Sequence, residues 1–301
     1  MSEPRRAAVI GLGSMGYGMA QSLLRAGFEV VGCDVSVEAL RRFREEGGEV
    51  ARTPALAAEG ADVVVSVVVN AAQTEAVLFG AEGAAQTLTQ GGVFVSSATM
   101  DPQVARRLAA ALEPTGRLYL DAPISGGAAR AAKGELTVMA SGSPAAFAAA
   151  GPALQAMAAT VYALGDAAGQ GAAFKMINQL LAGVHIAAAC EAIAFAAKQG
   201  LDLDKVYEVI TASAGNSWMF ENRVPHILAG DYSPASAIEI FVKDLGIVQD
   251  MARAERYPAP LAAAALQMYL AASGAGMGGD DDSSLARVYA QLSGAQLPEK
   301  S

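Results

Sequence analysis

The amino-acid sequence predicts an α/β protein in which a doubly wound parallel sheet is followed by an all-helical domain. Three observations support this fold class. Short β-branched runs alternate with helix-like segments up to residue 165, a glycine motif directly follows the first run, and the strand-like signals stop after Gly165. We therefore expect two domains, residues 1–164 and residues 165–301, of which the first is of Rossmann type.

The first half of the chain alternates between strand-like and helix-like segments. AAVIG (7–11) is a short apolar run that ends at a glycine, and SMGYGMAQSLLRAG (14–27) has helical periodicity and stops at Gly27. The continuous apolar run ADVVVSVVV (61–69) is typical of a strand that is covered on both faces. A second helix-like segment lies at 37–48, and the remaining strands of the expected parallel sheet lie at 28–34, 91–97, 117–123, 135–141 and 160–165.

The second half is alanine-rich and helical. Its first helix carries Lys175 and is expected to run from the first domain into the second. The helices are separated by breaks near Gly200, Gly215, Gly230, Pro258–Pro260 and Gly274–Gly279.

Composition and charge argue against several classes of protein. Of the 301 residues, 53% are hydrophobic and 17% charged, which is typical of a folded protein with a large core. The net charge of −9 predicts no basic face for nucleic acid, and we expect no apolar run that reaches the ~18 residues of a membrane span. Cys33 and Cys190 form neither a metal-ligand spacing nor a disulfide framework, so we expect a cytoplasmic protein without a metal site.

The motif GLGSMG is expected to bind the pyrophosphate of a dinucleotide, because it lies directly after a strand and opens a helix. Gly11 would allow the tight turn, Gly13 would let the backbone approach the pyrophosphate, and Gly16 would let the helix pack on the strand. The N–H groups at the start of the helix favour an anion. The alternative is plain turn chemistry. The expected cofactor-binding residues of the loop are Gly11, Leu12, Gly13, Ser14, Met15 and Gly16.

Asp34 is expected to select the cofactor. It ends the second strand-like run, at the distance from the glycines at which an acid can hydrogen-bond the ribose hydroxyls of the adenosine. A carboxylate at this position would repel a 2′-phosphate. The sequence therefore predicts NAD in preference to NADP.

Lys175 is an unusual residue in the apolar segment GQGAAFKMINQLLAG (169–183). On a helix, Lys175 and Asn178 share a face. Oxidation of an alcohol by hydride transfer needs a base for the hydroxyl proton, and partial burial beside a positive nicotinamide would lower the pKa of a lysine toward the working pH. Lys175 is the candidate base. The alternative is a structural lysine whose stem packs while its ammonium group reaches water.

Four motifs resemble the β-hydroxyacid dehydrogenases, the family that contains 3-hydroxyisobutyrate dehydrogenase and tartronate semialdehyde reductase. They are GLGSMGYGMAQSLLRAG near the N-terminus, DAPISGG (121–127), GDAAGQGAAFKMINQ (165–179) and FVKDLGIV (241–248), and together they cover nearly the full length. The resemblance implies a hydroxyacid dehydrogenase with Lys175 as general base. Imine reductases share the glycine motif but typically replace this lysine, which argues against that group.

The resemblance also implies further site residues. Those implied for the substrate are Ser125, Gly126, Gly127, Asn178 and Lys243, and those implied for the cofactor are Asn70, Thr99 and again Lys243. The Ser125 hydroxyl and the two glycine N–H groups would hold the substrate carboxylate. From the residues alone, 125–127 would be interpreted as a turn and Lys243–Asp244 as a surface pair.

The segment SAGNSWMFENRVPHILAGDYSP (213–234) is most similar to family members that oxidise the C2 hydroxyl of L-threonate with NAD, giving 2-dehydro-L-erythronate. Its polar side chains include Asn222, Arg223 and His226, and such donors suit a polyol better than a branched alkyl acid. The alternative is a connection between helices with surface polarity. Alternative substrates are 3-hydroxyisobutyrate, and glycerate or tartronate semialdehyde.

The alternative to an enzyme is a non-catalytic NAD(H)-sensing module. A sensor would need Asp34 and the glycines but would not need a base such as Lys175. The expected partner is a small-molecule hydroxyacid, with no nucleic acid and no membrane. The apolar helical half predicts a homodimer or homotetramer, because apolar helices beyond one core need partners.

Overall fold

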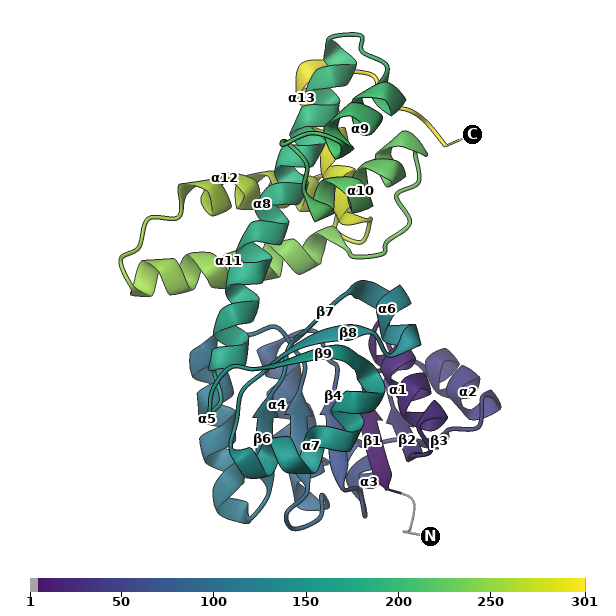
Figure 1. Cartoon of the computed structure of the whole chain (residues 1–301), viewed down its shortest axis with the longest axis vertical. Coiled ribbons are helices and arrows are strands. Elements are labelled where there is room, and N and C mark those ends of the chain that lie inside the picture. The colour runs from purple at the N-terminus through teal and green to yellow at the C-terminus, as the bar shows by residue number, and fades with distance from the viewer. Residues whose placement is uncertain (1–4, 301) are drawn as a thin grey trace. The chain divides into compact units, whose positions relative to one another are not determined.

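The computed structural model describes residues 5–300, which form two compact units (Figure 1). The first unit ends at Lys175 and the second begins at Met176. Both residues belong to one continuous helix, α8 (Gln170–Lys198), so no loop marks this division. The domain boundary that we expect after residue 164 marks the end of the strand-like segments, and it stays a prediction.

The core of the first unit is a parallel sheet with the strand order β3-β2-β1-β4-β5-β6. The chain winds outward from β1 in one direction and from β4 in the other, which is the doubly wound arrangement. The α/β fold class is thereby confirmed. The six strands are β1 (Arg6–Ile10), β2 (Glu29–Cys33), β3 (Glu49–Ala51), β4 (Val63–Ser66), β5 (Val93–Ser96) and β6 (Leu118–Asp121).

Helices cover both faces of this sheet, because successive side chains of a strand point to opposite faces. In β4, Val63 and Val65 join the core formed with α1 and α7, whereas Val64 joins the core formed with α4 and α5. The run at 61–69 is continuously apolar because side chains on both faces of β4 are buried. The helices of the first unit before α8 are α1 (Gly16–Arg25), α2 (Val37–Glu45), α3 (Pro54–Ala58), α4 (Ala71–Phe79), α5 (Pro102–Leu112), α6 (Gly127–Lys133) and α7 (Pro144–Met157).

The structure corrects the placement of the strand-like runs at 135–141 and 160–165. They do not extend the parallel sheet but form a separate sheet of order β7-β8-β9, in which β7 is antiparallel to β8. Pro123, which has no N–H for a ladder, lies between β6 and β7, and the two glycines that follow β7 take positive φ values. The strands of the second sheet are β7 (Ile124–Ser125), β8 (Leu136–Ala140) and β9 (Ala158–Ala163).

Within residues 176–300 the second unit consists of helices and the loops that join them, with one isolated bridge between Ala237 and Asp281. Its hydrophobic core joins Ile186 of α8 to Phe241 and Tyr269, whose rings stack with centroids 5.3 Å apart. Besides α8, the helices are α9 (Leu203–Thr211), α10 (Trp218–Leu228), α11 (Ile238–Ala254), α12 (Pro260–Ala272) and α13 (Leu285–Ser293).

Helix α8 is long and apolar enough to cross a membrane by length and composition alone. It has 29 residues, and its qualifying window has a mean hydropathy of 1.9. The sequence-based expectation counted only uninterrupted apolar runs, whereas a helical window tolerates polar residues. Half of the window is buried, and the core helix of a globular protein passes the same test, so α8 is weak evidence for a membrane span.

Candidate active site

The glycine loop joins β1 to α1, and its glycines occupy three different environments (Figure 1). Gly11 has a φ of +96°, and a Cβ there would lie 2.6 Å from the carbonyl oxygen of Val67. A Cβ on Gly16 would lie 1.9 Å from the carbonyl oxygen of Gly11, so only glycine lets α1 begin this close to the turn. A Cβ on Gly13 would meet nothing within 4 Å. The loop therefore offers its backbone at Gly13 for close approach by a ligand.

The first turn of α1 is suited to an anion. No side-chain hydrogen bond from Met15, the residue before the helix, caps this end, and the first turn contains no acidic residue. The N–H groups and the helix dipole therefore favour a pyrophosphate there. Of the other loop residues expected at the cofactor, Ser14 is exposed, whereas the side chain of Leu12 belongs to the core and leaves its backbone as the available group.

Asp34 stabilises the glycine loop by accepting a backbone hydrogen bond. One of its carboxylate oxygens accepts a hydrogen bond from the N–H of Leu12 at 2.5 Å, and the other accepts one from the N–H of Ser36 at 2.7 Å. A carboxylate has about four acceptor sites, so these two bonds leave capacity for ribose hydroxyls. The same side chain thus holds the loop and can present a negative charge to an adenosine ribose.

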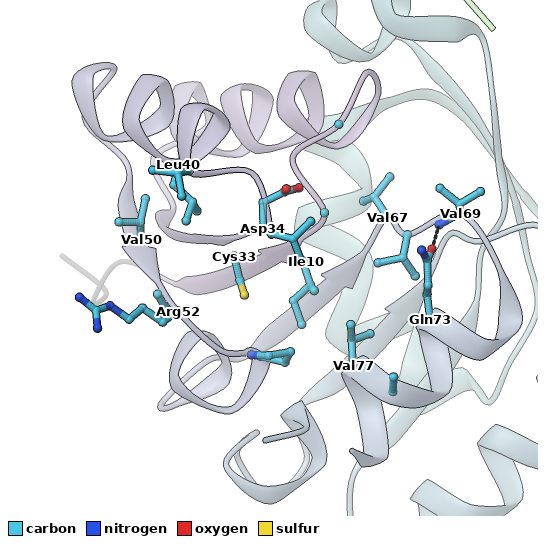
Figure 2. Close-up of a pocket in the computed structure, with 18 of the residues that line it drawn as sticks. Ile10, Cys33, Asp34, Leu40, Val50, Arg52, Val67, Val69, Gln73 and Val77 are labelled. Carbon is cyan, nitrogen blue, oxygen red and sulfur yellow. Dashed lines mark hydrogen bonds between the residues drawn. The ribbon is translucent and has the colours of Figure 1, made fainter. Parts of the chain in front are cut away.

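A cavity of 1140 Å³ opens beside Asp34 in the first unit. Figure 2 shows Cys33, Leu40 and Val50 on one side of it and Val69 and Val77 on the other. The N–H of Val69 donates to the side-chain oxygen of Gln73 at 2.8 Å, which fixes the wall at the start of α4. Mostly apolar walls with one carboxylate, three arginines and the glycine loop fit an adenosine moiety. The complete lining also includes Gly11, Gly13, Arg41, Arg44 and Arg52.

Asn70 and Thr99 follow neighbouring strands of the parallel sheet. Asn70 comes after β4 and Thr99 after β5, so both lie at the carboxyl edge, where the glycine loop and Asp34 also lie. Ligands of doubly wound sheets bind at this edge. The Asn70 side chain accepts a hydrogen bond from the N–H of Gln73 at 2.9 Å and so caps α4.

Ser125, Gly126 and Gly127 lie between β7 and α6. Ser125 is half-buried at the end of β7, and Gly127 is the first residue of α6. Gly126 and Gly127 have φ values of +134° and +75°, which residues with side chains rarely adopt. The turn interpretation therefore describes the local geometry correctly, and the backbone of this turn adjoins a helix start.

Asp121, the last residue of β6, contacts the beginning of α8. Its Oδ2 accepts hydrogen bonds from the N–H groups of Gly169 at 2.9 Å and Ala172 at 2.8 Å, and from the hydroxyl of Ser141 at 3.2 Å. Burial raises the pKa of Asp121 to about 6, while these donors and the charge of Arg106 act in the opposite direction. The first turn of α8 is thus joined to the sheet.

Lys175 lies on α8, three residues after Ala172, and is only 8% exposed. Its neighbours Phe174 and Ile177 are 52% and 61% exposed. An exposure of 8% does not fit the structural lysine described above, whose charged end would reach water. The burial of Lys175 therefore favours a role for this side chain other than contact with water.

In the second unit, Asn178 and Lys243 belong to one hydrogen-bond chain. Asn178 donates to the side-chain oxygen of Gln179 at 2.9 Å, and Gln179 donates to Asp244 Oδ2 at 2.5 Å. Lys243 Nζ lies 2.5 Å from Asp244 Oδ1. Since Asp244 is 1% exposed, the interpretation of Lys243–Asp244 as a surface pair is wrong. The carboxylate joins α8 to α11 and holds the lysine.

Several polar side chains of segment 213–234 contact other residues of the second unit. Arg223 is buried and paired with Asp282, with Nε 2.5 Å from Oδ1. It also donates to Asn222, while His226 Nδ1 lies 3.5 Å from Asp281 Oδ1. Asp281 and Asp282 are fully buried, so their contacts favour a structural use of Arg223.

Three residues that support the candidate site were not predicted from the sequence to do so: Asp121, Gln179 and Asp244. Each is adjacent in sequence to, or shares a motif with, a residue that was singled out, and this adjacency was the available signal. Their partners lie 48, 65 and 65 positions away, which no local pattern reveals. No group of three or more His, Cys, Asp or Glu residues within 5–300 could hold a metal ion.

Comparison with known proteins finds family matches along almost the whole chain. Residues 6–165 match the model described as the NAD binding domain of 6-phosphogluconate dehydrogenase. Residues 169–289 match the model described as NAD-binding of NADP-dependent 3-hydroxyisobutyrate dehydrogenase.

Individual relatives agree with these matches. The L-threonate dehydrogenase of Cupriavidus necator is 56% identical over 98% of this chain and 99% of its own length. The mitochondrial 3-hydroxyisobutyrate dehydrogenase of Mus musculus is 33% identical over 86% of this chain and 79% of its own length. A crystal structure described as 3-hydroxyisobutyrate dehydrogenase from Salmonella typhimurium superposes with a TM-score of 0.90 at 49% identity, over 94% of this chain and 99% of that one.

Proposed function

This chain belongs to the β-hydroxyacid dehydrogenase family, and from that premise we propose that it oxidises the C2 hydroxyl of L-threonate to 2-dehydro-L-erythronate with NAD. It is an NAD-dependent hydroxyacid oxidoreductase. One observation supports the choice of substrate: identity is 56% to an L-threonate dehydrogenase over nearly both full lengths, but 33% to a mammalian 3-hydroxyisobutyrate dehydrogenase.

The first unit holds the cofactor in this proposal. The loop from Gly11 to Gly16 and the start of α1 receive the pyrophosphate, and Asp34 receives the adenosine ribose. Support comes from the open backbone at Gly13 and from the apolar cavity beside Asp34. Asn70 and Thr99 act at the same carboxyl edge. NAD supplies the acceptor for the hydride that leaves C2.

Lys175 is the proposed general base. It removes the proton of the C2 hydroxyl while the C2–H bond breaks and its electron pair leaves as hydride, so that the carbon becomes a ketone carbon and the lysine becomes an ammonium. The burial of Lys175, which is only 8% exposed, supports this role. An NAD(H)-sensing module has no use for such a residue, which favours the enzyme.

The remaining residues orient the substrate in this proposal. The Ser125 hydroxyl and the N–H groups of Gly126 and Gly127 hold the carboxylate, and Asn178 and Lys243 contact substrate or cofactor. The chain from Asn178 through Gln179 and Asp244 to Lys243 supports a shared task for the two outer residues. Arg223 is not included, because its guanidinium is paired with Asp282.

The test is a comparison of hydroxyacids by NADH formation with the purified protein. We expect kcat/KM for L-threonate to exceed that for 3-hydroxyisobutyrate, by up to roughly 10⁴-fold, because a site with donors for substrate hydroxyls leaves them unpaired against an alkyl acid. D-Glycerate, which keeps one neighbouring hydroxyl, should lie between the two. A higher kcat/KM for 3-hydroxyisobutyrate would reject L-threonate as the substrate.

The second candidate is therefore 3-hydroxyisobutyrate, which the description of the Salmonella typhimurium structure favours. The same assay decides between the two. An absence of turnover with every hydroxyacid, together with NADH binding, would instead support a sensing module.

We also propose that the protein works as a homodimer or homotetramer in the cytoplasm. The exposed apolar side chains along α8 support self-association, since a face of this kind is costly in water. The free, buried state of Cys33 and Cys190 is compatible with a reducing compartment.

A further inference from the structure

We propose that Asp121 is a positioning residue for Lys175: by accepting hydrogen bonds from the first turn of α8, its carboxylate fixes where that helix begins and therefore where Lys175 is held. The functional part of this inference rests on the proposed role of Lys175 as the base. The structural part depends only on contacts within the first unit.

Helix α8 lacks a local N-terminal cap. The first N–H groups of a helix have no intrahelical partners, and a Ser, Thr, Asp or Asn immediately before the helix normally accepts a hydrogen bond from them. The residue before α8 is Gly169, which has no side chain to do so. Asp121 Oδ2 takes over this task from the end of β6, 48 positions earlier, through Gly169 and Ala172.

Ser141 completes the cap. Its hydroxyl oxygen accepts a hydrogen bond from the N–H of Gly171 at 2.9 Å and donates its own proton to Asp121. The backbones of Asp121 and Ser141 exchange two further hydrogen bonds, at 3.0 and 2.8 Å. Two side chains from the ends of two strands thus receive three N–H groups of one helical turn, which fixes the register of α8 against the sheets.

Gly171 shows how close the helix lies to its support. A Cβ at this position would lie 2.3 Å from the carbonyl oxygen of Met139 and 2.9 Å from that of Asp121. Both atoms are backbone and cannot move aside cheaply. The first turn is therefore held by hydrogen bonds on one side and by steric contact with two strands.

The position of Lys175 follows from this support, because it lies one turn beyond Ala172 on the same helix. A slip of one residue would rotate the lysine by roughly 100° about the helix axis. A displacement of about 1 Å can lower turnover by about 10²-fold when a reacting group must be aligned. The carboxylate at the end of β6, together with the Ser141 hydroxyl, supplies this restraint.

The test compares Asp121→Ala with Asp121→Asn in the full chain. Asn can place its amide oxygen where Oδ2 now accepts, whereas Ala leaves three donors without an acceptor. We expect Asp121→Ala to lower kcat by about 10²-fold with the KM for NAD changed less than about threefold, and Asp121→Asn to retain kcat within about threefold. Asp202→Ala is the matched control, since Asp202 caps α9 through Lys205 N–H at 3.1 Å and lies outside the proposed site.

Ser141→Ala and Gly171→Ala keep the test decisive if Asp121→Ala does not fold. Each weakens the same turn by a different route, and each should lower kcat by about tenfold or more without a matching change in the KM for NAD. The inference is overturned if the folded Asp121→Ala variant keeps kcat within threefold of wild type, or if Asn is as damaging as Ala. The inference is also overturned if Ser141→Ala and Gly171→Ala are both as active as the control Asp202→Ala.

Hydrogen exchange of the peptide spanning residues 165–180 separates this inference from the proposed function. We expect Asp121→Ala to lose at least tenfold protection there while Asp121→Asn does not, whatever the substrate proves to be. If protection is lost but L-threonate is not oxidised by wild type, the substrate proposal fails alone. If L-threonate is oxidised and the peptide stays protected in Asp121→Ala, the positioning role fails alone.

Discussion

At the scale of single residues, Lys175 and Asp244 share a feature that sequence position did not reveal: each is an ionisable side chain that is almost fully buried. Burial of a charged group is costly unless hydrogen bonds or opposite charges compensate. Asp244 is compensated by Gln179 and Lys243. For Lys175 the proposed use of the buried side chain is proton transfer.

Replacement of Lys175 by alanine tests that reason. We expect Lys175→Ala to lower kcat by roughly 10²–10⁴-fold, the range that general acid–base groups contribute. NADH binding should change little, because the glycine loop and Asp34 do not depend on this side chain. Steady-state kinetics and NADH titration give the two quantities.

The control is Lys198→Ala, which removes the exposed lysine at the other end of the same helix. It should leave both quantities near wild type. Retention of more than about a tenth of wild-type turnover by Lys175→Ala would be inconsistent with a general base, whose loss costs at least ~10²-fold.

The candidate site was predictable where chemistry and spacing coincide in one segment. Gly11, Gly13, Gly16 and Asp34 follow a known spacing, and the structure gives them the matching environments. Arg223 illustrates the opposite case. Its polarity suggested a substrate donor, but its partner Asp282 lies 59 positions away and takes up the guanidinium. Local polarity cannot distinguish a ligand-binding side chain from one that satisfies a distant buried acid.

At the scale of elements, the sequence predicted strands better than their partners. A period of two identifies a strand, but β8 and β9 show that the same pattern serves a second sheet equally well. The short strand β3 (Glu49–Ala51) was not expected, because three residues are too few to show alternation. The support of α8 by Asp121 could not be predicted either. Gly169, the residue before the helix, has no side chain that could cap it, and nothing in the local sequence points to Asp121 as the acceptor.

The contact between β6 and α8 predicts a pH dependence of stability. Burial raises the pKa of Asp121 from 3.8 to about 6, so the folded protein binds this proton more tightly than the unfolded chain does. Its contribution to the free energy of unfolding is therefore largest below about pH 4 and is lost as the pH rises to about 6. This difference corresponds to ~3 kcal/mol. Arg106 and Tyr119 are the other ionisable groups that interact with Asp121.

The measurement compares wild type with Asp121→Asn, which cannot ionise, by hydrogen exchange of β6 amides between about pH 4 and pH 7. We expect the wild-type protein to lose up to ~3 kcal/mol relative to the variant across this interval. A wild-type protein that instead gains stability relative to Asp121→Asn would show that the hydrogen bonds outweigh burial and hold the pKa of Asp121 below 3.8.

At the scale of the whole molecule, the two units divide the chemistry between them. The first unit has the features of a dinucleotide site, and the second has a helical core whose buried acids Asp244 and Asp282 hold Lys243 and Arg223. The sequence led us to expect two domains, because strand-like segments change to helix-like ones near residue 165. It could not predict that Lys175 and Asn178, one turn apart, belong to different units.

The exposed face of α8 leads to a prediction about assembly. Phe174, Ile177, Leu181 and Phe195 are 52%, 61%, 49% and 65% exposed, and their spacing of three, four and fourteen residues follows a heptad pattern. Apolar side chains in this pattern pair with another helix. We expect light scattering to give at least twice the chain mass of 30.6 kDa.

Phe195→Glu should lower the mass measured by light scattering, because a charge on this apolar face of α8 opposes burial. Leu292→Glu, an equally apolar and exposed position on α13, should not, and the opposite result would place the contact away from α8.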